Sequence, residues 1–268
     1  MRRPDWAPAT IDTDRPSAAR MYDYFLGGSH NFAVDREAAQ AMIAAVPETP
    51  LIAQANRAFL RRAVRFLVEA GVRQFLDIGS GIPTVGNVHE IAQGMAPEST
   101  VAYVDIDPGV VGHSREILAG NERAVAIQAD IRDPDRILDH PDVLKLIDFG
   151  QPVALMIVAV MHYIRDDDQP PEIVARLRSA LVPGSYLVLS QVCGDGRTET
   201  EWDEASAVYQ RTDLPLSIRG RDAIIRLFDG FTLVEPGVVW VPEWRPDTPH
   251  TVDDAERSIY IGGVGRLS

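Results

Sequence analysis

The chain is poor in cysteine and lysine and has no long apolar run. Cys193 is the only cysteine among 268 residues, so an intrachain disulfide framework is excluded. Neither a signal peptide nor an apolar run of ~18 residues is found, so we expect a cytoplasmic protein with no membrane partner. Lys145 is the only lysine, and the formal net charge is −13. Because no basic cluster is interleaved with aromatics, we expect no nucleic-acid partner, and a small or neutral substrate is favoured.

Length and helix signals divide the chain into two parts. A chain of 268 residues can bury one sizeable core and leave some residues for an appendage. Three helical stretches come first: Ser17 to Leu26, which Gly27 and Gly28 would end, Arg36 to Val46 with Asp35 as N-cap, and a longer helix from Thr49 and Pro50 to Gly71. We therefore predict an N-terminal helical cap or lid over residues 1–70 and one compact catalytic unit over residues 71–268.

From Gln74 onward, short apolar runs alternate with helical patterns. The predicted strands are Gln74 to Ile78, Thr100 to Asp105, Ala124 to Gln128, Val153 to Val160, Ser185 to Val192, Phe231 to Val239 and Ser258 to Gly263. The predicted helices are Thr84 to Gln93, Pro108 to Leu118, Pro134 to Leu146, Pro170 to Leu181, Thr198 to Arg211 and Arg221 to Phe228. Such alternation indicates a parallel sheet, and the Pro- and Asp-rich loop before the last strand indicates an antiparallel hairpin. We predict an α/β, Rossmann-like fold with a seven-stranded, mostly parallel sheet.

The segment Phe75 to Ala92 predicts a buried strand, a glycine turn and the start of a helix. Glycine lets the backbone approach a ligand where any Cβ would collide, and the free N–H groups at the start of the helix form a polar floor. We therefore predict that Gly79, Ser80 and Gly81 contact a cofactor.

Asp77 decides which cofactor this turn suits. The third glycine of the dinucleotide fingerprint is replaced by Thr84, and Asp77 stands two residues before the first glycine. A carboxylate there would repel a pyrophosphate but attract the amino group or sulfonium of S-adenosylmethionine (SAM). The pattern Asp-x-Gly-x-Gly after a strand resembles motif I of the Rossmann-like SAM-dependent methyltransferases.

Acids also close the next two predicted strands. Asp105 follows the second glycine by 24 residues and can accept both hydroxyls of a ribose, so Asp105 and Ile106 are assigned to the cofactor site. Asp107, before a proline, is either a ligand or the N-cap of the next helix, and we favour the cap. Resemblance to the methyltransferases implies that Asp130 accepts the adenine amino group and that the Ile131 N–H binds a ring nitrogen. Ligands bind at the carboxyl ends of such strands, where all three acids fall.

The fourth predicted strand leads into His162, which would lie near the methionine part of the cofactor. His162 is either a general base or hydrogen-bond donor, or a histidine whose ring is satisfied by the backbone at the end of a strand. Asp166, Asp167 and Asp168 follow, and consecutive acids are more typical of a solvated loop than of a metal site. We therefore predict no metal.

The helical prelude is rich in polar and aromatic side chains. Tyr22, Tyr24, His30 and Asn31, around a double glycine, suit a lid that shapes a substrate pocket, although a surface helical hairpin with ordinary caps would explain them too. Arg57 could reach the cofactor carboxylate from the long helix, or could serve solubility alone.

Several segments together resemble one family. They are Asp14 to Gly28, Asn31 to Arg36, Asn56 to Arg62, Phe75 to Gly81 and Trp244 to Pro246. They are similar to the actinobacterial SAM methyltransferases long described as a domain of unknown function, Methyltransf_19. The resemblance spans almost the whole chain and implies a seven-stranded Rossmann-like sheet with an N-terminal helical cap and SAM as cofactor, with S-adenosylhomocysteine as product. It names no acceptor and leaves a homo-oligomer open.

Three functions compete at this point. The leading one is methyl transfer from SAM to a small-molecule acceptor by in-line displacement, in which alignment and exclusion of water provide most of the acceleration. The second is a catalytically silent SAM-binding sensor or interaction protein, which an exposed apolar surface on the helical cap would favour. The third is a nicotinamide-dependent enzyme, which Asp77, Thr84 and the terminal hairpin disfavour.

Overall fold

The structure is a computed structural model that describes residues 13–82, 86–195, 202, 207–209, 212, 216–248 and 254–268. The helices are α1 Ala18–Phe25, α2 Ala33–Ala45, α3 Thr49–Glu69, α4 Val88–Met95, α5 Pro108–Ile117, α6 Pro134–Leu138, α7 Pro141–Leu146, α8 Pro170–Arg178 and α10 Arg221–Ile225, with short 3₁₀ turns η1 Met161–Tyr163, η2 Asp166–Asp168, η3 Arg226–Phe228, η4 Val241–Glu243 and η5 Ala255–Ser258. The strands are β1 Gln74–Ile78, β2 Thr100–Asp105, β3 Ala124–Gln128, β4 Val153–Val158, β5 Tyr186–Val192, β6 Thr232–Leu233, β7 Val239–Trp240 and β8 Tyr260–Arg266. No described helix is long and apolar enough to cross a bilayer.

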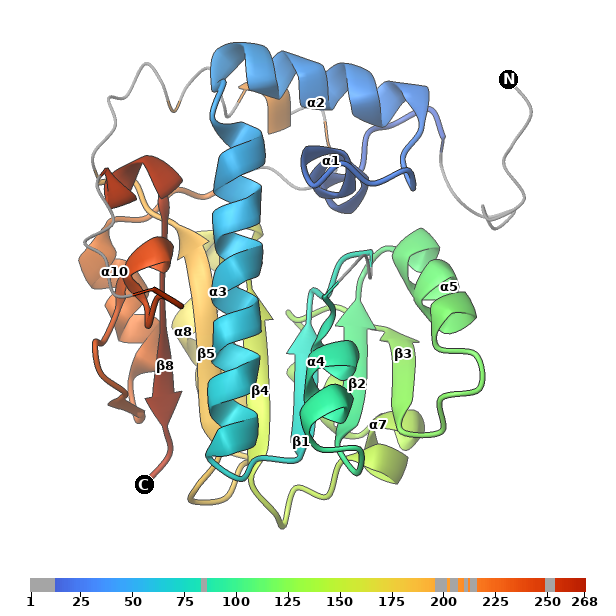
Figure 1. Ribbon diagram of the computed structural model, residues 1–268, viewed down its shortest axis with the longest axis vertical. Coiled ribbons are helices and arrows are strands. Elements are labelled where there is room, and N and C mark those ends of the chain that lie inside the picture. Colours follow the sequence, from blue (N-terminus) through green and yellow to red (C-terminus); the bar gives the residue numbers. More distant parts are fainter. Residues whose placement is uncertain are drawn as a thin grey trace.

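One mostly parallel sheet forms the centre of the molecule (Figure 1). The strand order is β3-β2-β1-β4-β5-β8-β6, with β7 paired to β8 as well. The first five strands are parallel, and β8 runs antiparallel to β5, β6 and β7. The predicted α/β fold with antiparallel C-terminal strands is confirmed. From β1 the chain adds β2 and β3 on one side of the sheet and then returns to add β4 and β5 on the other side. The order in which strands are added therefore reverses beside β1.

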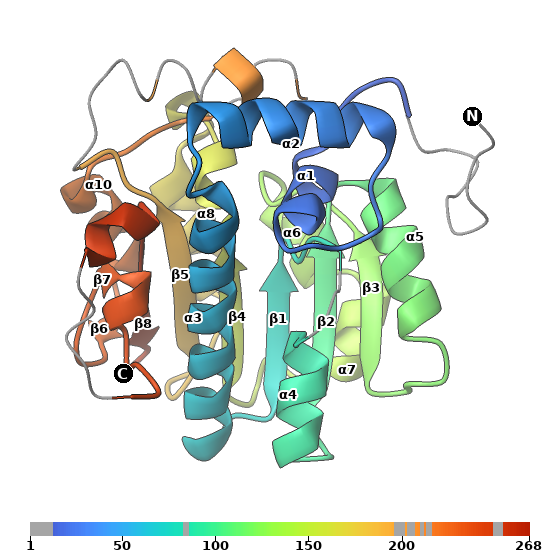
Figure 2. The same ribbon diagram turned by 45° about the horizontal axis from the view of Figure 1, so that its top comes forward.

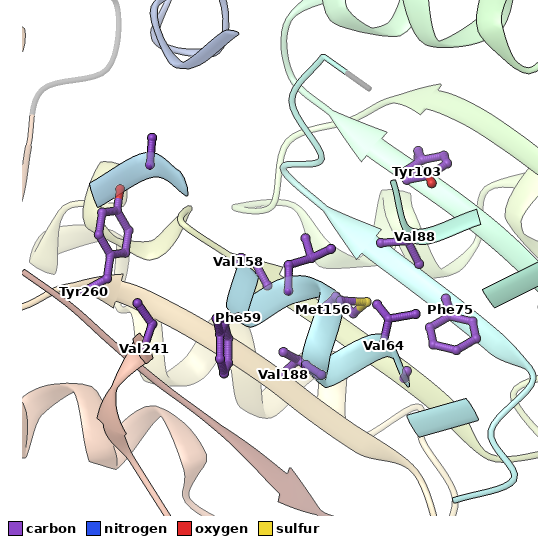
Figure 3. Packing of buried hydrophobic residues seen from close by; sticks show 14 of the residues in the cluster. Phe59, Val64, Phe75, Val88, Tyr103, Met156, Val158, Val188, Val241 and Tyr260 are labelled. Atoms are coloured by element: carbon purple, nitrogen blue, oxygen red, sulfur yellow. The ribbon is translucent and has the colours of Figure 1, made fainter. Parts of the chain in front are cut away.

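Alternating side chains build a core on each face of the sheet. Phe75, Tyr103 and Met156 belong to the cluster beneath α3, α4 and α5, part of which is drawn in Figure 3, whereas Leu76 and Leu155 belong to the cluster beneath α6, α7 and α8. Since successive side chains of a strand point to opposite faces, the face of each residue follows from its position. Extended by two residues, the same alternation places Asp77 after Phe75, and Asp105 after Tyr103, on the α3 face.

The three N-terminal helices take two different places. α3 lies along one face of the sheet, while α1 and α2 lie across the carboxyl ends of the parallel strands (Figure 2). Buried residues of all three helices belong to one hydrophobic cluster with the sheet. Only α1 and α2 therefore lie where a lid would lie. We call these two helices the α1–α2 pair.

Several sequence predictions about element boundaries need correction. The helix predicted over Thr84 to Gln93 is α4, which runs from Val88 to Met95. The strand predicted over Phe231 to Val239 is two short strands, β6 and β7, because Pro236 lies between them and has no N–H for a ladder. The helix predicted over Pro134 to Leu146 divides into α6 and α7 at Pro141, whose ring cannot continue the α6 hydrogen bonds. The last strand runs from Tyr260 to Arg266 instead of Ser258 to Gly263.

Asp35 also differs from its predicted role. α2 begins at Ala33 with Phe32 as N-cap, and Asp35 is the third residue of the helix, where its carboxylate accepts the Phe32 N–H at 2.7 Å. The capping contact exists, but it comes from inside the helix. Thr84 lies outside the described residues, as does most of the helix predicted over Thr198 to Arg211.

Candidate functional site

A cleft lies at the carboxyl ends of four adjacent strands, β3, β2, β1 and β4. Its described lining is Ala18, Ala19, Tyr22, Asn56, Arg57, Leu60, Asp77, Ile78, Gly79, Ser80, Gly81, Asp105, Ile106, Ala129, Asp130, Ile131, Arg132, Val158, Ala159, Val160, Tyr163 and Ile164. Neighbouring strands lie about 4.8 Å apart, so the four strand ends span roughly 14 Å, enough for an elongated ligand. The nine residues predicted to bind the cofactor all border this one cleft.

The two glycines of the turn after β1 serve different purposes. Both have left-handed backbones, with φ of +71° at Gly79 and +64° at Gly81. A Cβ on Gly79 would lie 2.2 Å from Val160 Cγ2, whereas a Cβ on Gly81 would meet nothing within 4 Å. Gly79 is therefore required by packing between β1 and β4, and Gly81 leaves open space in the cleft. Both glycines line the cleft, and that both make room for a ligand stays a prediction.

We expect Gly79→Ala to destabilise the protein by roughly 2–5 kcal/mol, because the substitution combines backbone strain with a clash. Gly71→Ala is the matched control: Gly71 has a φ of +90°, but a Cβ there meets nothing within 4 Å. Gly71→Ala should therefore cost only about 1–2 kcal/mol. Urea unfolding of the two variants measures the difference, and equal losses would show that Val160 imposes no constraint.

Asp105 is held in a fixed orientation at the end of β2. Its Oδ2 accepts the Gly81 N–H at 2.9 Å and its Oδ1 accepts the Asp107 N–H at 2.9 Å. Burial raises the pKa of Asp105 to about 6, although the N–H groups of Asp107 and Gly81 oppose the rise. A carboxylate oriented in this way can accept two vicinal hydroxyls. Asp107 itself accepts the Gly109 N–H at 2.7 Å, which confirms the predicted N-cap of α5.

Asp77 lies deeper, at the end of β1, and is 4% exposed. Burial raises its pKa to about 7; the positive charge of Arg57 lowers this pKa, and the charge of Asp105 raises it. The site therefore holds a carboxyl group that ionises near neutral pH. Such a group gains most from a cationic ligand, which would offset the desolvation of the carboxylate.

Arg57 extends from α3 into the same cleft and is 8% exposed. Its Nε is buried and has no hydrogen-bond partner among the described residues. A buried guanidinium donor without a partner is costly, so its presence indicates an anionic or carbonyl ligand. The group fits the carboxylate of an amino acid moiety, which guanidinium binds well.

A chain of hydrogen bonds joins α1, α3 and β5 beside Arg57. Ser190 Oγ donates to Asn56 Oδ1 at 2.6 Å, Asn56 Nδ2 donates to Tyr22 Oη at 3.1 Å, and Tyr22 Oη donates to the Ala53 carbonyl at 3.1 Å. The chain fixes the Tyr22 ring against the cleft. Burial raises the pKa of Tyr22, so its phenol stays neutral.

The opposite end of the cleft is formed after β3. Asp130 accepts hydrogen bonds from the backbone N–H of Arg132 and from its guanidinium, the shortest at 2.6 Å. Burial raises the pKa of Asp130, but the hydrogen bonds and charge of Arg132 outweigh burial and hold this pKa below its usual range. Ile131 is buried and Ile106 is 40% exposed, so together they supply apolar surface for a flat ring.

His162 does not border the cleft. It is 1% exposed, and its ring stacks near Tyr163 and Tyr260 with centroid distances of 4.3 and 5.7 Å. Burial, with Arg219 nearby, lowers the pKa of His162 to about 3. A base role for His162 stays a prediction, and it would require the ring to gain access to the cleft.

Of the four residues predicted for a substrate pocket, only Tyr22 borders the cleft. Tyr24 Oη accepts a hydrogen bond from Gln40, and the His30 ring packs on His113 of α5 at 3.9 Å. Asn31 donates to Asp23 and to the Gly28 carbonyl, within the turn that joins α1 and α2. Residues of α2, of α5 and of the turn thus engage these side chains, so a pocket role for Tyr24, His30 and Asn31 stays a prediction that this arrangement does not favour.

Sequence reasoning missed several lining residues. Arg132 had a local signal, since it stands two residues after Asp130, and Tyr163 stands next to the predicted His162. Ala159 had none: its φ of +60° is rare for a residue with a Cβ, and it adopts this conformation in the loop after β4. Among the described residues, no group of three or more His, Cys, Asp or Glu side chains could hold a metal ion.

The reversal of strand order beside β1 and the acids at the ends of β1, β2 and β3 define a class, the Rossmann-like SAM-dependent methyltransferases. The chain belongs to the S-adenosyl methyltransferase family, whose model matches residues 4–268. SAM is the cofactor of this family, and the resemblance inferred from the sequence is confirmed. Comparison with curated proteins found no match.

Solved structures agree with this assignment. A candidate methyltransferase from Thermobifida fusca YX is 41% identical, with a TM-score of 0.92, and the match covers 99% of this chain and 100% of that one. A DUF574 family protein from Streptomyces avermitilis MA-4680 is 40% identical, with a TM-score of 0.90 and coverage of 96% and 99%. Human N-acetylserotonin methyltransferase in complex with SAM is 13% identical, with a TM-score of 0.50 and coverage of 92% and 62%, and shares the fold.

Proposed function

We propose that this chain transfers the methyl group of SAM to a small-molecule acceptor. The observation that carries the proposal is the buried Nε of Arg57, which has no partner among the described residues and lies in one cleft with Asp77 and Asp105. One buried cation and two buried carboxyl groups complement the carboxylate, amino group and ribose of a nucleoside that bears an amino acid. The net charge of −13 also favours an acceptor that is not a polyanion.

Each part of the cofactor has a candidate partner in this chain. Arg57 would bind the carboxylate, and Asp77 the amino group or sulfonium. Asp105 would bind the ribose hydroxyls, with Gly79, Ser80 and Gly81 beneath the chain between them. Asp130, Ile106 and Ile131 would bind adenine by its edge and face. These assignments rest on the charge and position of the side chains around the cleft.

When bound, SAM supplies an activated methyl group on a sulfonium, which an acceptor displaces in line. The chain's own part is to align and to exclude water. Ala18, Ala19 and Tyr22 of α1 form one wall of the cleft, so α1 would shield the reacting atoms. Tyr22, held by Asn56, and Tyr163 lie at the β4 end, where the acceptor would bind. We propose no metal for this reaction.

A silent SAM-binding protein is the competing function, and it predicts an apolar docking surface on the helical cap. In the part of the chain that the structure describes, Leu51 is the only large apolar residue between 18 and 69 that is exposed by more than a third. A single exposed side chain is ordinary for a soluble surface. Catalysis is therefore the better supported proposal.

Calorimetry with SAM and S-adenosylhomocysteine tests the cofactor assignment. We expect both to bind the wild type, and Arg57→Met to weaken binding roughly 10- to 100-fold because a buried charge-assisted contact is lost. Arg65→Met is the matched control, since Arg65 lies on the same helix but pairs with Asp247 at the surface. No binding by the wild type would refute the proposed function. Binding that is unchanged in Arg57→Met would refute only the role of Arg57.

A screen for S-adenosylhomocysteine formation with pooled small molecules then separates catalysis from silent binding. Turnover of any acceptor supports the proposal, provided that Asp105→Ala lowers it at limiting SAM. Tight binding with no turnover across chemically diverse acceptors would favour the sensor.

A further inference from the structure

Ser17 uses its side chain in an unusual way for its position. It is the N-cap of α1, where a serine hydroxyl ordinarily accepts an N–H from the first turn of its own helix. Here the side chain makes no such bond. Its Oγ instead donates to Asp107 Oδ2 at 2.8 Å, across 90 residues of sequence. The hydroxyl therefore joins the α1–α2 pair to the start of α5.

Asp107 receives contacts from α5 and α1, and through Arg20 it is linked to α2. Its Oδ1 caps α5 through the Gly109 N–H, and its Oδ2 accepts from Ser17. Arg20 Nη1 lies 3.8 Å from the same Oδ2, while Arg20 Nε donates to Asp35 of α2 at 2.7 Å. Arg20 and Asp35 are buried, at 5% and 0% exposure. The junction of α1, α2 and α5 is therefore centred on charged groups that are directly paired.

Asp107 also orients Asp105, the carboxylate that we propose binds the ribose. The Asp107 N–H donates to Asp105 Oδ1, and the Gly81 N–H donates to Asp105 Oδ2, both at 2.9 Å. Residues 105–107 thus connect the cleft on one side with α1 on the other. Ala18 and Ala19, directly after Ser17, line that cleft. Movement of α1 away from the cleft would break the Ser17 contact with Asp107.

We propose that Asp107 is a positioning residue through which docking of the α1–α2 pair and SAM binding stabilise each other. Ser17 holds Asp107, and the Asp107 backbone holds the Asp105 carboxylate in the orientation that accepts the ribose hydroxyls. By linkage, whatever SAM gains from the docked pair, the docked pair gains from SAM. The part of the inference that concerns SAM binding rests on the proposed function. The part that concerns docking of the α1–α2 pair rests on the contacts of the ligand-free structure.

The test is Ser17→Ala, which removes the contact without removing a cap bond of α1. Without SAM, we expect the Gly81 and Asp107 amides to exchange with deuterium several-fold faster in this variant. We expect Kd for SAM to rise roughly 5- to 20-fold, as for the loss of one hydrogen bond to a charged group. Added SAM should slow exchange in α1 less in the variant than in the wild type. Ser17→Thr should restore all three readouts.

Two further variants complete the design. Ser179→Ala is the matched control, because among the described residues its hydroxyl bonds only with Arg176 of α8, and it should match the wild type. Asp107→Asn preserves the cap and an acceptor for Ser17 but removes the charge. This variant should therefore fold, and it should weaken SAM binding less than Ser17→Ala does. If Ser17→Ala leaves amide exchange and Kd unchanged, the proposal is overturned. If exchange quickens but wild type binds no SAM, the contact stands and the cofactor assignment falls.

Discussion

Replacing Asp77 with asparagine should stabilise the ligand-free protein near neutral pH and remove most of its affinity for SAM. The two effects have one cause, the burial that raises the pKa of Asp77 from 3.8 to about 7. A buried carboxyl that must ionise opposes folding, and the same ionised group attracts a cationic ligand. An amide of equal size has neither property.

The sign of the stability effect follows from linkage. The unfolded chain releases the Asp77 proton near pH 3.8 and the folded protein near pH 7, so the folded state binds more protons between these values. The contribution of Asp77 to wild-type stability therefore falls as pH rises from about 4 to 7 and levels off above 7. The interval corresponds to roughly 4 kcal/mol, at about 1.4 kcal/mol per pH unit. Asp77→Asn should match the wild type at pH 4 and exceed it by roughly 2–4 kcal/mol at pH 8.

The binding effect has the opposite sign. In the proposed role of Asp77, SAM binds its ionised form, so wild-type affinity should rise with pH up to about 7, approaching tenfold per unit at the acidic end. Asp77→Asn should bind at least roughly 100-fold more weakly and lose this slope. Urea unfolding between pH 4 and 8 measures the stability and calorimetry between pH 5.5 and 8 measures the affinity, with Asp142→Asn, at an exposed pair with Lys145, as control. A variant that is no more stable than wild type at pH 8 would show that Asp77 is not held neutral.

Asp105→Ala should weaken SAM binding roughly 100-fold while the protein stays folded, since two hydrogen bonds to a charged acceptor are lost. The fold should survive because the substitution removes a buried carboxyl whose pKa is raised to about 6, which offsets the loss of its contacts with Gly81 and Asp107. Calorimetry measures the affinity, and circular dichroism with urea unfolding checks the fold. Asp105→Asn keeps an acceptor oxygen, so its affinity for SAM should lie between those of the wild type and Asp105→Ala.

Asp142→Ala is the matched control for this second experiment, because Asp142 lies on the surface at the start of α7, away from the cleft. It should bind SAM as the wild type does. If Asp105→Ala also binds as the wild type does, the ribose assignment is wrong, and the carboxylate serves only to hold the turn after β1.

Local chemistry explains why most of the central sheet could be predicted. β1, β2 and β3 have the predicted bounds, because each is a short apolar run between turn residues and helix signals. α5 begins at Pro108 after the Asp107 cap, and α3 begins at Thr49 before Pro50. The strand predicted over Phe231 to Val239 failed for a local reason, because Pro236 interrupts the ladder between β6 and β7.

The acids at the strand ends could be predicted because side chains alternate between the two faces of a strand and because parallel strands end at the same edge of the sheet. Asp77 and Asp105 continue the alternation of buried residues on the α3 face, and parallel strands end at one edge. Arg57 could only be suspected, since the helical pattern of α3 does not reveal whether an arginine meets solvent or a cleft. Its burial depends on the angle at which α3 crosses the sheet.

The sequence by itself determined the class of fold, the cofactor and the row of acids that would meet it, because these depend on spacing along one element or on adjacent strands. Only the tertiary structure decided which polar residues of the N-terminal region border the cleft. Tyr22 does, while Tyr24, His30 and Asn31 do not, and Ser17 contacts Asp107 from 90 residues away. Such contacts arise from the packing of α1 and α2 across the strand ends, and packing between distant segments leaves no period in the sequence.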